Sequence, residues 1–107
     1  MPDTSFAALL ERVDSATDTN RLQLTPDWMQ GRAGYGGLVG ALALKAMRSH
    51  VPPASTVRSL LISFVGPVGP EDFSIRTHVL RSGKAVTHVE AKLVQKETVR
   101  CVVLGDF

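Results

Sequence analysis

The pattern of hydrophobic and polar residues divides the chain into a helical first half and a strand-rich second half. Over residues 5–14 apolar residues recur at helical spacing, and the face that they share consists of Phe6, Leu9, Leu10 and Val13. Residues 21–25 alternate weakly and predict a short strand, and residues 26–34 predict a loop. A second helix is expected over residues 36–49, because Val51-Pro52-Pro53 ends the helical pattern.

The expected helix 36–49 has no polar face, since Lys45 is the only charged residue between Leu38 and Ala46. A helix that is apolar all round is a buried helix. Gly40 inside it costs roughly 1 kcal/mol relative to alanine, so its presence requires a compensating reason. Small residues make this helix slim, and they predict that a sheet approaches it closely: Gly36, Gly37, Gly40, Ala41 and Ala43.

The second half predicts an antiparallel meander. Four runs enriched in β-branched residues alternate with period two, at residues 56–66, 72–81, 84–95 and 98–105. Turns are expected at Gly66–Pro70, Ser82-Gly83 and Lys96-Glu97. Helices that precede a run of strands indicate an α+β plan. We therefore predict a single domain over residues 1–107, with an antiparallel sheet of four to five strands wrapped around one slim apolar helix, which is the hotdog architecture.

Composition narrows the function classes. The 107 residues are 44% apolar and 21% charged, with a net charge of +2, which is typical of one small soluble domain. Lys and Arg are scattered, which disfavours nucleic acid as a partner but leaves room for a ligand with phosphates. Cys101 is the single cysteine, so a reducing cytoplasm is the expected compartment. No signal-peptide pattern opens the chain, and no apolar run reaches the roughly 18 residues that span a bilayer, so no membrane association is expected.

The glycine cluster matches neither of the two common phosphate-binding motifs. Five of the nine glycines fall between residues 31 and 40. A dinucleotide fingerprint would need glycine where Val39 stands, and no βαβ unit surrounds the cluster. A P-loop fails as well, because Gly83-Lys84 is followed by Ala85 and lacks the upstream glycine.

Three blocks of the sequence resemble the N-terminal half of the type II acyl-CoA thioesterases: WMQGRAGYGGLVGALALKAM, LLISFVGPVGPED and LRSGKAVTHVEAKLVQ. Four marks of that family occur in order over residues 28–107. They are a glycine pair that opens the central helix, a strand ending in Phe-x-x-Pro from Phe64 to Pro67, the hairpin Arg81-Ser82-Gly83, and a strand ending in Gln95. The resemblance implies a hotdog fold, a fatty acyl-CoA substrate and a tandem arrangement of two hotdog units. It implies that the family's catalytic Asp, Ser or Thr, and Gln lie mostly in the second unit.

Candidate site residues follow from the resemblance together with simple chemistry. Backbone N–H groups at the helix start Tyr35-Gly36-Gly37 are placed to stabilise the oxyanion of a thioester, although tight helix–sheet packing explains the glycines equally well. Ser59 takes, by analogy, the strand position of the second unit's aspartate. Residues that would contact the substrate are Tyr35, Trp28, Arg81, Gly83 and Lys84, the last three near the CoA phosphates; a packing role for Trp28 and a solvated hairpin are the alternatives.

Other polar residues carry weaker indications. His50, His78 and His88 have no further ligand at metal-binding spacing, so no metal and no cofactor is expected, and His78 and His88 are expected on a solvated face. Glu71 and Asp72 are expected to be solvated in a turn. Cys101 is expected to serve packing.

A lone hotdog unit leaves an exposed edge strand, so we expect pairing with a second unit, either as a homodimer of this chain or with a second hotdog domain. Two functions remain open. One is hydrolysis of acyl-CoA thioesters, with a general base supplied by the second unit. The other is a non-catalytic acyl-CoA-binding or dimerisation unit. An acyl hydratase is a weaker third, because the Asp-to-His spacing near the helix is absent.

Overall fold

The computed structural model describes residues 5–13, 19–24, 26–30, 33–34 and 36–107. Two α-helices are present in these ranges, α1 (Phe6–Glu11) and α2 (Gly36–Met47), with short 3-10 turns at Pro26–Trp28 and Arg48–His50. The strands are β1 (Thr19–Leu22), β2 (Met29–Gln30), β3 (Ala33–Gly34), β4 (Ser59–Phe64), β5 (Phe73–Ser82), β6 (Thr87–Gln95) and β7 (Thr98–Asp106).

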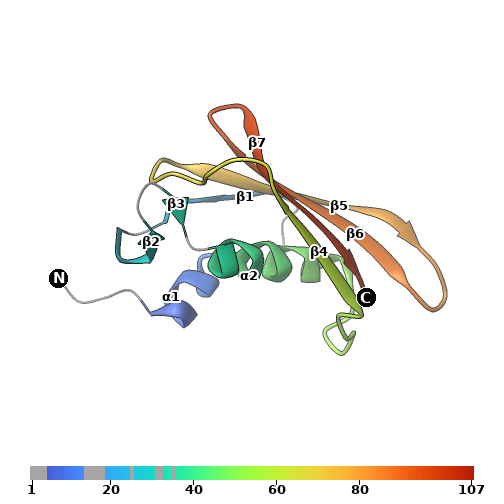
Figure 1. The fold of residues 1–107 in the computed structure, drawn as a ribbon. Helices are drawn as coiled ribbons and strands as arrows, with labels where there is room; N and C mark the ends of the chain where they lie inside the picture. Colours follow the sequence, from blue (N-terminus) through green and yellow to red (C-terminus); the bar gives the residue numbers. More distant parts are fainter. Residues whose placement is uncertain (1–4, 14–18, 25, 31–32, 35) are drawn as a thin grey trace.

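Five of the strands form one antiparallel sheet in the spatial order β1-β5-β6-β7-β4, and α2 lies along one face of it (Figure 1). This arrangement confirms the predicted α+β plan of a sheet wrapped around one apolar helix. Two boundaries differ from prediction, because α2 ends at Met47 and passes into a 3-10 turn, and β4 begins only at Ser59. The predicted loop 26–34 was wrong in part, since β2 and β3 pair there as a small separate sheet.

The inner face of the sheet supplies most of the core. Alternate residues of β5 and β6 are buried against α2, as the period-two alternation over residues 72–81 and 84–95 predicts: Phe73, Ile75, Thr77, Val89, Ala91 and Leu93. Val79 is an exception, since it is exposed, and the register of β5 against β6 shifts directly after it, between Val79 and Arg81. Lys45, the single charge in the apolar helix, donates from Nζ to the Leu10 carbonyl oxygen and so fastens the last turn of α1 to α2.

Glycines allow α2 and the sheet to approach one another, as the sequence predicted. A Cβ on Gly40 would lie 2.8 Å from the Ile62 Cδ1 atom of β4. The opposite surface has its own glycine, since a Cβ on Gly105 of β7 would lie 2.6 Å from Met47 Cε and 3.1 Å from Phe107 Cε1. The helix therefore sits closer to the sheet than side chains of ordinary size would allow.

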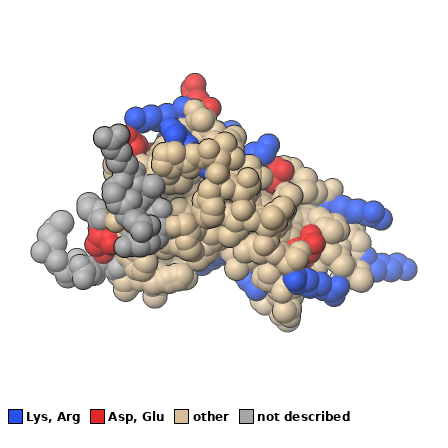
Figure 2. Space-filling model, viewed as in Figure 1, with Lys and Arg blue, Asp and Glu red and all other residues tan. Residues whose placement is uncertain are grey.

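The two edges of the sheet differ. β1 is four residues long, and Arg12 reaches along it to donate from Nη1 to the Gln23 carbonyl oxygen at 3.5 Å. β4 is six residues long, and Leu61 and Phe64 on it are 65% and 57% exposed. The centre of the molecular face over β4 and α2 carries few charges, whereas Lys and Arg gather at the β5–β6 hairpin (Figure 2). β4 is thus the edge suited to pairing with another strand.

The predicted turn at Lys96-Glu97 is a two-residue hairpin turn in the structure. Lys96 and Glu97 join β6 to β7 with φ values of 52° and 61°. Positive φ at both central residues is the geometry of the type I′ turn, which matches the twist of the flanking strands. The β5–β6 connection is longer than the predicted Ser82-Gly83 turn, because the Gly83 N–H donates to the Val86 carbonyl oxygen at 2.8 Å.

Replacing Gly105 with alanine tests the close helix–sheet contact. The added methyl group meets Met47, Phe107 and Leu60 together, so the core cannot relax in one direction, and we expect a loss of about 1–3 kcal/mol in the free energy of unfolding. Urea denaturation measures it. Gly37→Ala is the matched control, because a Cβ on Gly37 meets nothing within 4 Å. Equal stabilities of the two variants would contradict the contact.

Candidate functional site

The first turn of α2 leaves space for a ligand at Gly37, the second residue of the helix. Gly37 is exposed, and no atom lies within 4 Å of the position that its Cβ would take. The first N–H groups of a helix have no partner within the helix, and they carry the positive end of its dipole. The helix start at Gly36 and Gly37 therefore offers backbone N–H donors, and at Gly37 no side chain occupies the Cβ position beside them.

An aromatic side chain borders this opening. Phe64, the last residue of β4, directs its ring edge at Gly36, and a Cβ on Gly36 would lie 3.0 Å from Phe64 Cζ. Phe64 and the following Val65 are 57% and 62% exposed. An apolar border beside polar backbone donors is the composition expected of a site for a ligand with a carbonyl group and a hydrocarbon chain.

Of the two aromatic residues predicted to contact substrate, the structure describes only Trp28. Trp28 packs against the core, and its ring lies 6.1 Å from the Phe6 ring of α1 with 45° between the planes. Its position therefore agrees with the alternative packing role. Tyr35 lies outside the described residues.

Ser59 lies far from Gly36 and Gly37 in this unit. The N-terminal end of α2 contacts Phe64, while its C-terminal end contacts Gly105, which pairs with Leu60. Ser59 and Phe64 are the two ends of β4, about 17 Å apart at roughly 3.4 Å per residue. Leu60 and Ile62 pack toward α2, so the alternation of side chains turns Ser59 to the outer face of the sheet.

On that outer face Ser59 belongs to a cluster of three polar side chains from three strands. Ser59 Oγ donates to Asp106 Oδ2 at 2.7 Å, and His88 Nδ1 lies 2.6 Å from Asp106 Oδ1. The hydrogen bond from Ser59, and next the one from His88, hold the pKa of Asp106 below its usual value. The prediction that His88 is only solvated was therefore wrong, because it contacts Asp106. Ser59 and His88 both bond to the carboxylate rather than to each other, so the cluster is not a nucleophile–base pair.

The β5–β6 hairpin lies at the same far end of the sheet. Arg81 pairs with His88, which pairs in turn with Asp106. The structure therefore groups Arg81, Gly83 and Lys84 with Ser59 and not with the opening of α2. Within one unit the sequence-predicted site residues form two sets, separated by the length of the helix.

At the other end of the sheet, the side-chain amide of Gln95 holds the loop between β4 and β5. Its Oε1 accepts from the Gly69 N–H at 2.9 Å, and its Nε2 donates to the carbonyl oxygens of Gly69 and Glu71 at 3.1 and 2.8 Å. Gln95 is 2% exposed. Each strong donor and acceptor of the amide is engaged, so Gln95 serves structure here, not chemistry.

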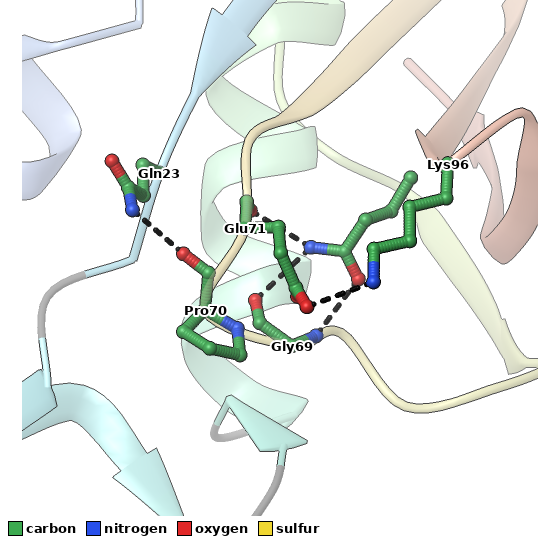
Figure 3. A network of polar contacts seen from close by, with 6 residues as sticks. Gln23, Gly69, Pro70, Glu71 and Lys96 are labelled. Atoms are coloured by element: carbon green, nitrogen blue, oxygen red, sulfur yellow. Dashed lines mark hydrogen bonds and ion pairs between the residues drawn. The ribbon is translucent and has the colours of Figure 1, made fainter.

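Glu71, which belongs to this loop, forms an ion pair with Lys96, although the sequence predicted a solvated residue. Lys96 Nζ lies 3.0 Å from Glu71 Oε1 (Figure 3), and the hydrogen bond from Lys96 lowers the pKa of Glu71. Both partners are substantially exposed, so the pair contributes little to stability but leaves neither charge free for a ligand.

Sequence reasoning missed the Asp106 cluster and the Gln95 clamp for different reasons. Gln95 shares its strand face with Val89, Ala91 and Leu93, so a polar residue at an inward position was a visible signal. Asp106 joins residues 47 and 18 positions away, and no local pattern reports that register. The contact between His50 and Thr77 was missed for the same reason: His50 Nε2 lies 2.8 Å from Thr77 Oγ1, and the two residues are 27 positions apart.

The described part of the chain holds no group of three or more His, Cys, Asp or Glu arranged to bind a metal ion. No helix in the same ranges is long and apolar enough to cross a membrane. Cys101 is buried in the core, and burial raises the pKa of its thiol.

Comparison with known proteins identifies the family of this chain. Residues 24–107 match the acyl-CoA thioesterase N-terminal domain family. The chain belongs to that family. A search of curated protein sequences finds no significant match.

Solved structures agree with the fold of this thioesterase domain. A proposed thioesterase II from Thermobifida fusca superposes with a TM-score of 0.83 at 24% identity, over 99% of this chain and 40% of that one. A hot dog fold protein from Alicyclobacillus acidocaldarius gives 0.78 at 20% identity, over 92% and 38%. A Bacillus halodurans protein solved with CoA gives 0.80 at 20% identity, over 99% and 76%. The fold is a hotdog, and the chain spans about two fifths of the length of the first two structures.

The lowered pKa of Asp106 predicts how stability depends on pH. A carboxyl whose folded pKa lies below its unfolded value of about 3.9 contributes fully above that value, and the contribution is lost as pH falls through the folded pKa. We expect Asp106→Asn to be less stable than the parent at pH 7, and the difference to shrink below about pH 4. Urea denaturation from pH 2 to 7 measures it.

Ser59→Ala is the matched control for this pH dependence. It removes the main cause of the lowered pKa but keeps the carboxylate and its contact with His88, so we expect a smaller change of the same sign. A difference between Asp106→Asn and the parent that stays constant across this pH range would refute the assignment.

Proposed function

We propose that this chain is one hotdog unit of an acyl-CoA thioesterase and that it holds the thioester carbonyl at the N-terminus of α2. The observation that carries the proposal is the open position of Gly37 in the first turn of α2, where nothing lies within 4 Å of a Cβ, close to the exposed ring of Phe64. Membership of the acyl-CoA thioesterase N-terminal domain family supports the substrate class.

The chemistry requires stabilisation of a developing negative charge. The oxygen of water attacks the thioester carbonyl carbon, and the carbonyl oxygen becomes an oxyanion. The N–H groups of Gly36 and Gly37 donate to that oxygen, helped by the helix dipole. The carbon–sulfur bond then breaks, and the products are a carboxylic acid and the CoA thiol, which takes up a proton. Phe64 and Val65 cover the first carbons of the acyl chain.

The base that activates the water is assigned to a second hotdog unit. Asp106 lies at the opposite end of α2, and Glu71 is paired with Lys96. The pKa values of both carboxyls are lowered, which makes each a weaker proton acceptor. The limited span of the chain relative to the longer structures it resembles supports a second unit in the complete assembly.

The second unit pairs along β4 in this proposal. Antiparallel pairing reverses the partner strand, so the far end of the second unit comes beside Phe64 and the opening of α2. Directly opposed residues of paired strands point to the same face of a sheet. Residues that face the helices in the second unit therefore complete the site, and a residue on the outer face, as Ser59 is here, does not reach it.

A non-catalytic acyl-CoA-binding unit is the second candidate. The full engagement of Gln95 and the positions of Asp106 and Glu71 favour it, because this unit then contributes donors and an apolar border but no acid or base. In that case the chain binds acyl-CoA and does not release thiol.

A proline at position 37 separates the N–H donor from the shape of the site. Proline is tolerated in the first turn of a helix but has no N–H, so Gly37→Pro removes a donor with little change to α2. We expect a fall of about 10²–10³ in kcat for release of CoA thiol from acyl-CoA. Gly37→Ala is the control, since it keeps the N–H and places its methyl group in open space.

The assay uses acyl-CoAs of several chain lengths with the complete protein, and circular dichroism verifies the folded state of each variant. Equal kcat for Gly37→Pro and Gly37→Ala would exclude Gly37 as an oxyanion donor. Binding of acyl-CoA without any thiol release would favour the non-catalytic unit.

Sedimentation tests pairing along β4. The 107-residue chain has a mass of 11.5 kDa, and we expect a species of twice that mass when no second unit is supplied. Leu61 is 65% exposed on this edge strand. Leu61→Lys places like charges near each other across the paired edges, so we expect it to shift the equilibrium toward monomer. A parent chain that stays at 11.5 kDa at high concentration contradicts self-pairing.

A further inference from the structure

Arg100 is an extra residue of β7 at the place where this strand pairs with β6. Leu93 of β6 pairs with Cys101 and Val94 pairs with Val99, so Arg100 has no partner residue on β6. One extra residue of this kind is a β-bulge, which bends its strand and gives a side chain a new direction. Bulges are frequent next to active sites, so the surroundings of Arg100 are a place to look for a ligand.

Arg100 lies against the end of β4 with both its backbone and its side chain. Its carbonyl oxygen accepts hydrogen bonds from the N–H groups of Val65 and Gly66 at 2.9 and 3.0 Å. A Cβ on Gly66 would lie 3.5 Å from Arg100 Cδ and 3.6 Å from Arg100 Nη1. The side chain therefore lies beside Gly66, two residues after Phe64, whose ring borders Gly36 at the first turn of α2.

The charge of Arg100 is partly removed from water and has no counter-ion. Its Nε atom is buried and has no hydrogen-bond partner, and none of the ion pairs in the described ranges includes this residue. Arg100 as a whole is only half-buried, which leaves part of its surface within reach of a ligand. An anion is attracted more strongly to such a charge than to a fully solvated one. A buried donor without a partner is rare in native structures, and a bound ion is one explanation for it.

The neighbouring charge favours a carboxylate over a phosphate. The hydrogen bond from Lys96 is the main cause of the lowered pKa of Glu71, and the positive charge of Arg100 adds to it. The negative charge of Glu71 therefore acts on any anion at Arg100, and it repels a doubly charged phosphate more than a singly charged carboxylate. A single guanidinium group also matches one carboxylate with two parallel hydrogen bonds.

The spacing fits an acyl chain of short length. Phe64 and Gly66 are at most about 7 Å apart, at roughly 3.4 Å per residue. A carbon–carbon bond is about 1.5 Å long, so we expect an acyl chain of about four to six carbon atoms to span this distance. Phe64 and Val65, both exposed, offer apolar surface to the methylene groups in between.

We propose that Arg100 binds a carboxylate at the far end of the acyl chain, so that the ligands of this unit are thioesters of short dicarboxylic acids. The thioester carbonyl lies at the first turn of α2, and the terminal nitrogens of Arg100 donate hydrogen bonds to the free carboxylate. The position of the thioester rests on the proposed function. The preference for a terminal carboxylate is a property of binding and does not depend on hydrolysis.

Pairs of thioesters with equal numbers of acyl carbon atoms test this preference. Succinyl-, glutaryl- and adipyl-CoA are compared with butanoyl-, pentanoyl- and hexanoyl-CoA, so that any contribution of coenzyme A cancels within each pair. With the complete protein we expect a higher kcat/KM for the dicarboxylic member of at least one pair. Arg100→Met keeps an unbranched side chain and is expected to lower that value about ten- to a hundredfold, the usual effect of losing hydrogen bonds to a charged group. The straight-chain member is expected to be unaffected.

Two further variants define the role of the guanidinium group. Arg100→Lys is expected to keep part of the preference, because the charge remains but the paired donors are lost. Arg76→Met is the matched control, since Arg76 is exposed and lies on β5 between the buried residues Ile75 and Thr77, which places it on the outer face of the sheet. Thermal unfolding verifies the fold of each variant.

Two results would overturn the inference. One is a parent protein that prefers the straight-chain thioester in all three pairs, a comparison that needs no variant. The other is an equal loss of kcat/KM for dicarboxylic thioesters in Arg100→Met and Arg76→Met.

Thioether analogues, which cannot be hydrolysed, separate this inference from the proposed function. Calorimetry measures their binding to the parent and to Arg100→Met. Tighter binding of the analogue with a terminal carboxylate, lost in Arg100→Met, together with no thiol release from any thioester, supports the role of Arg100 and refutes hydrolysis. Hydrolysis of the straight-chain thioesters, with no effect of Arg100→Met on the dicarboxylic ones, refutes the role of Arg100 alone.

Discussion

The close approach of α2 to the sheet is the constraint on which the rest of this structure depends. Gly40 on the helix and Gly105 on β7 remove side chains from the surfaces that meet, and Ile62 and Met47 fill the space. A helix held this closely cannot shift along the sheet without collisions, so its first turn has a defined position beside the end of β4. Gly37, in the first turn, takes no part in this packing, and nothing lies within 4 Å of its Cβ position.

The unit has different chemistry at the two ends of its helix. At the N-terminal end, donors of α2 lie beside the exposed ring of Phe64. At the C-terminal end, Asp106 joins Ser59 of the edge strand to His88 of the neighbouring strand, and this cluster holds β4 in register. Antiparallel pairing along β4, as proposed, would place unlike ends of two units together at this edge. The other edge strand, β1, is short, and Arg12 donates to the Gln23 carbonyl oxygen just beyond its end.

Much of the architecture could be predicted, because it rests on local periodicity. Alternation in the second half placed Phe73, Ile75 and Leu93 inward, and the pattern of residues 38–46, apolar except for Lys45, placed α2 in the core. The Lys96-Glu97 turn also followed from sequence, since two residues between alternating runs favour a two-residue hairpin. The β2–β3 pair was missed because each strand has only two residues, too few for any period to show.

The sequence by itself determined the order of elements, the buried slim helix and the family, because periodicity and short motifs are properties of neighbouring residues. Only the tertiary structure decided which polar residues meet. Register between distant strands brought Asp106 to Ser59 across 47 positions, and it turned Gln95 onto the loop that carries Gly69. The same register separated Ser59 and Arg81 from Gly37. A shift of one residue in pairing would send each side chain to the other face, and no local pattern contains that information.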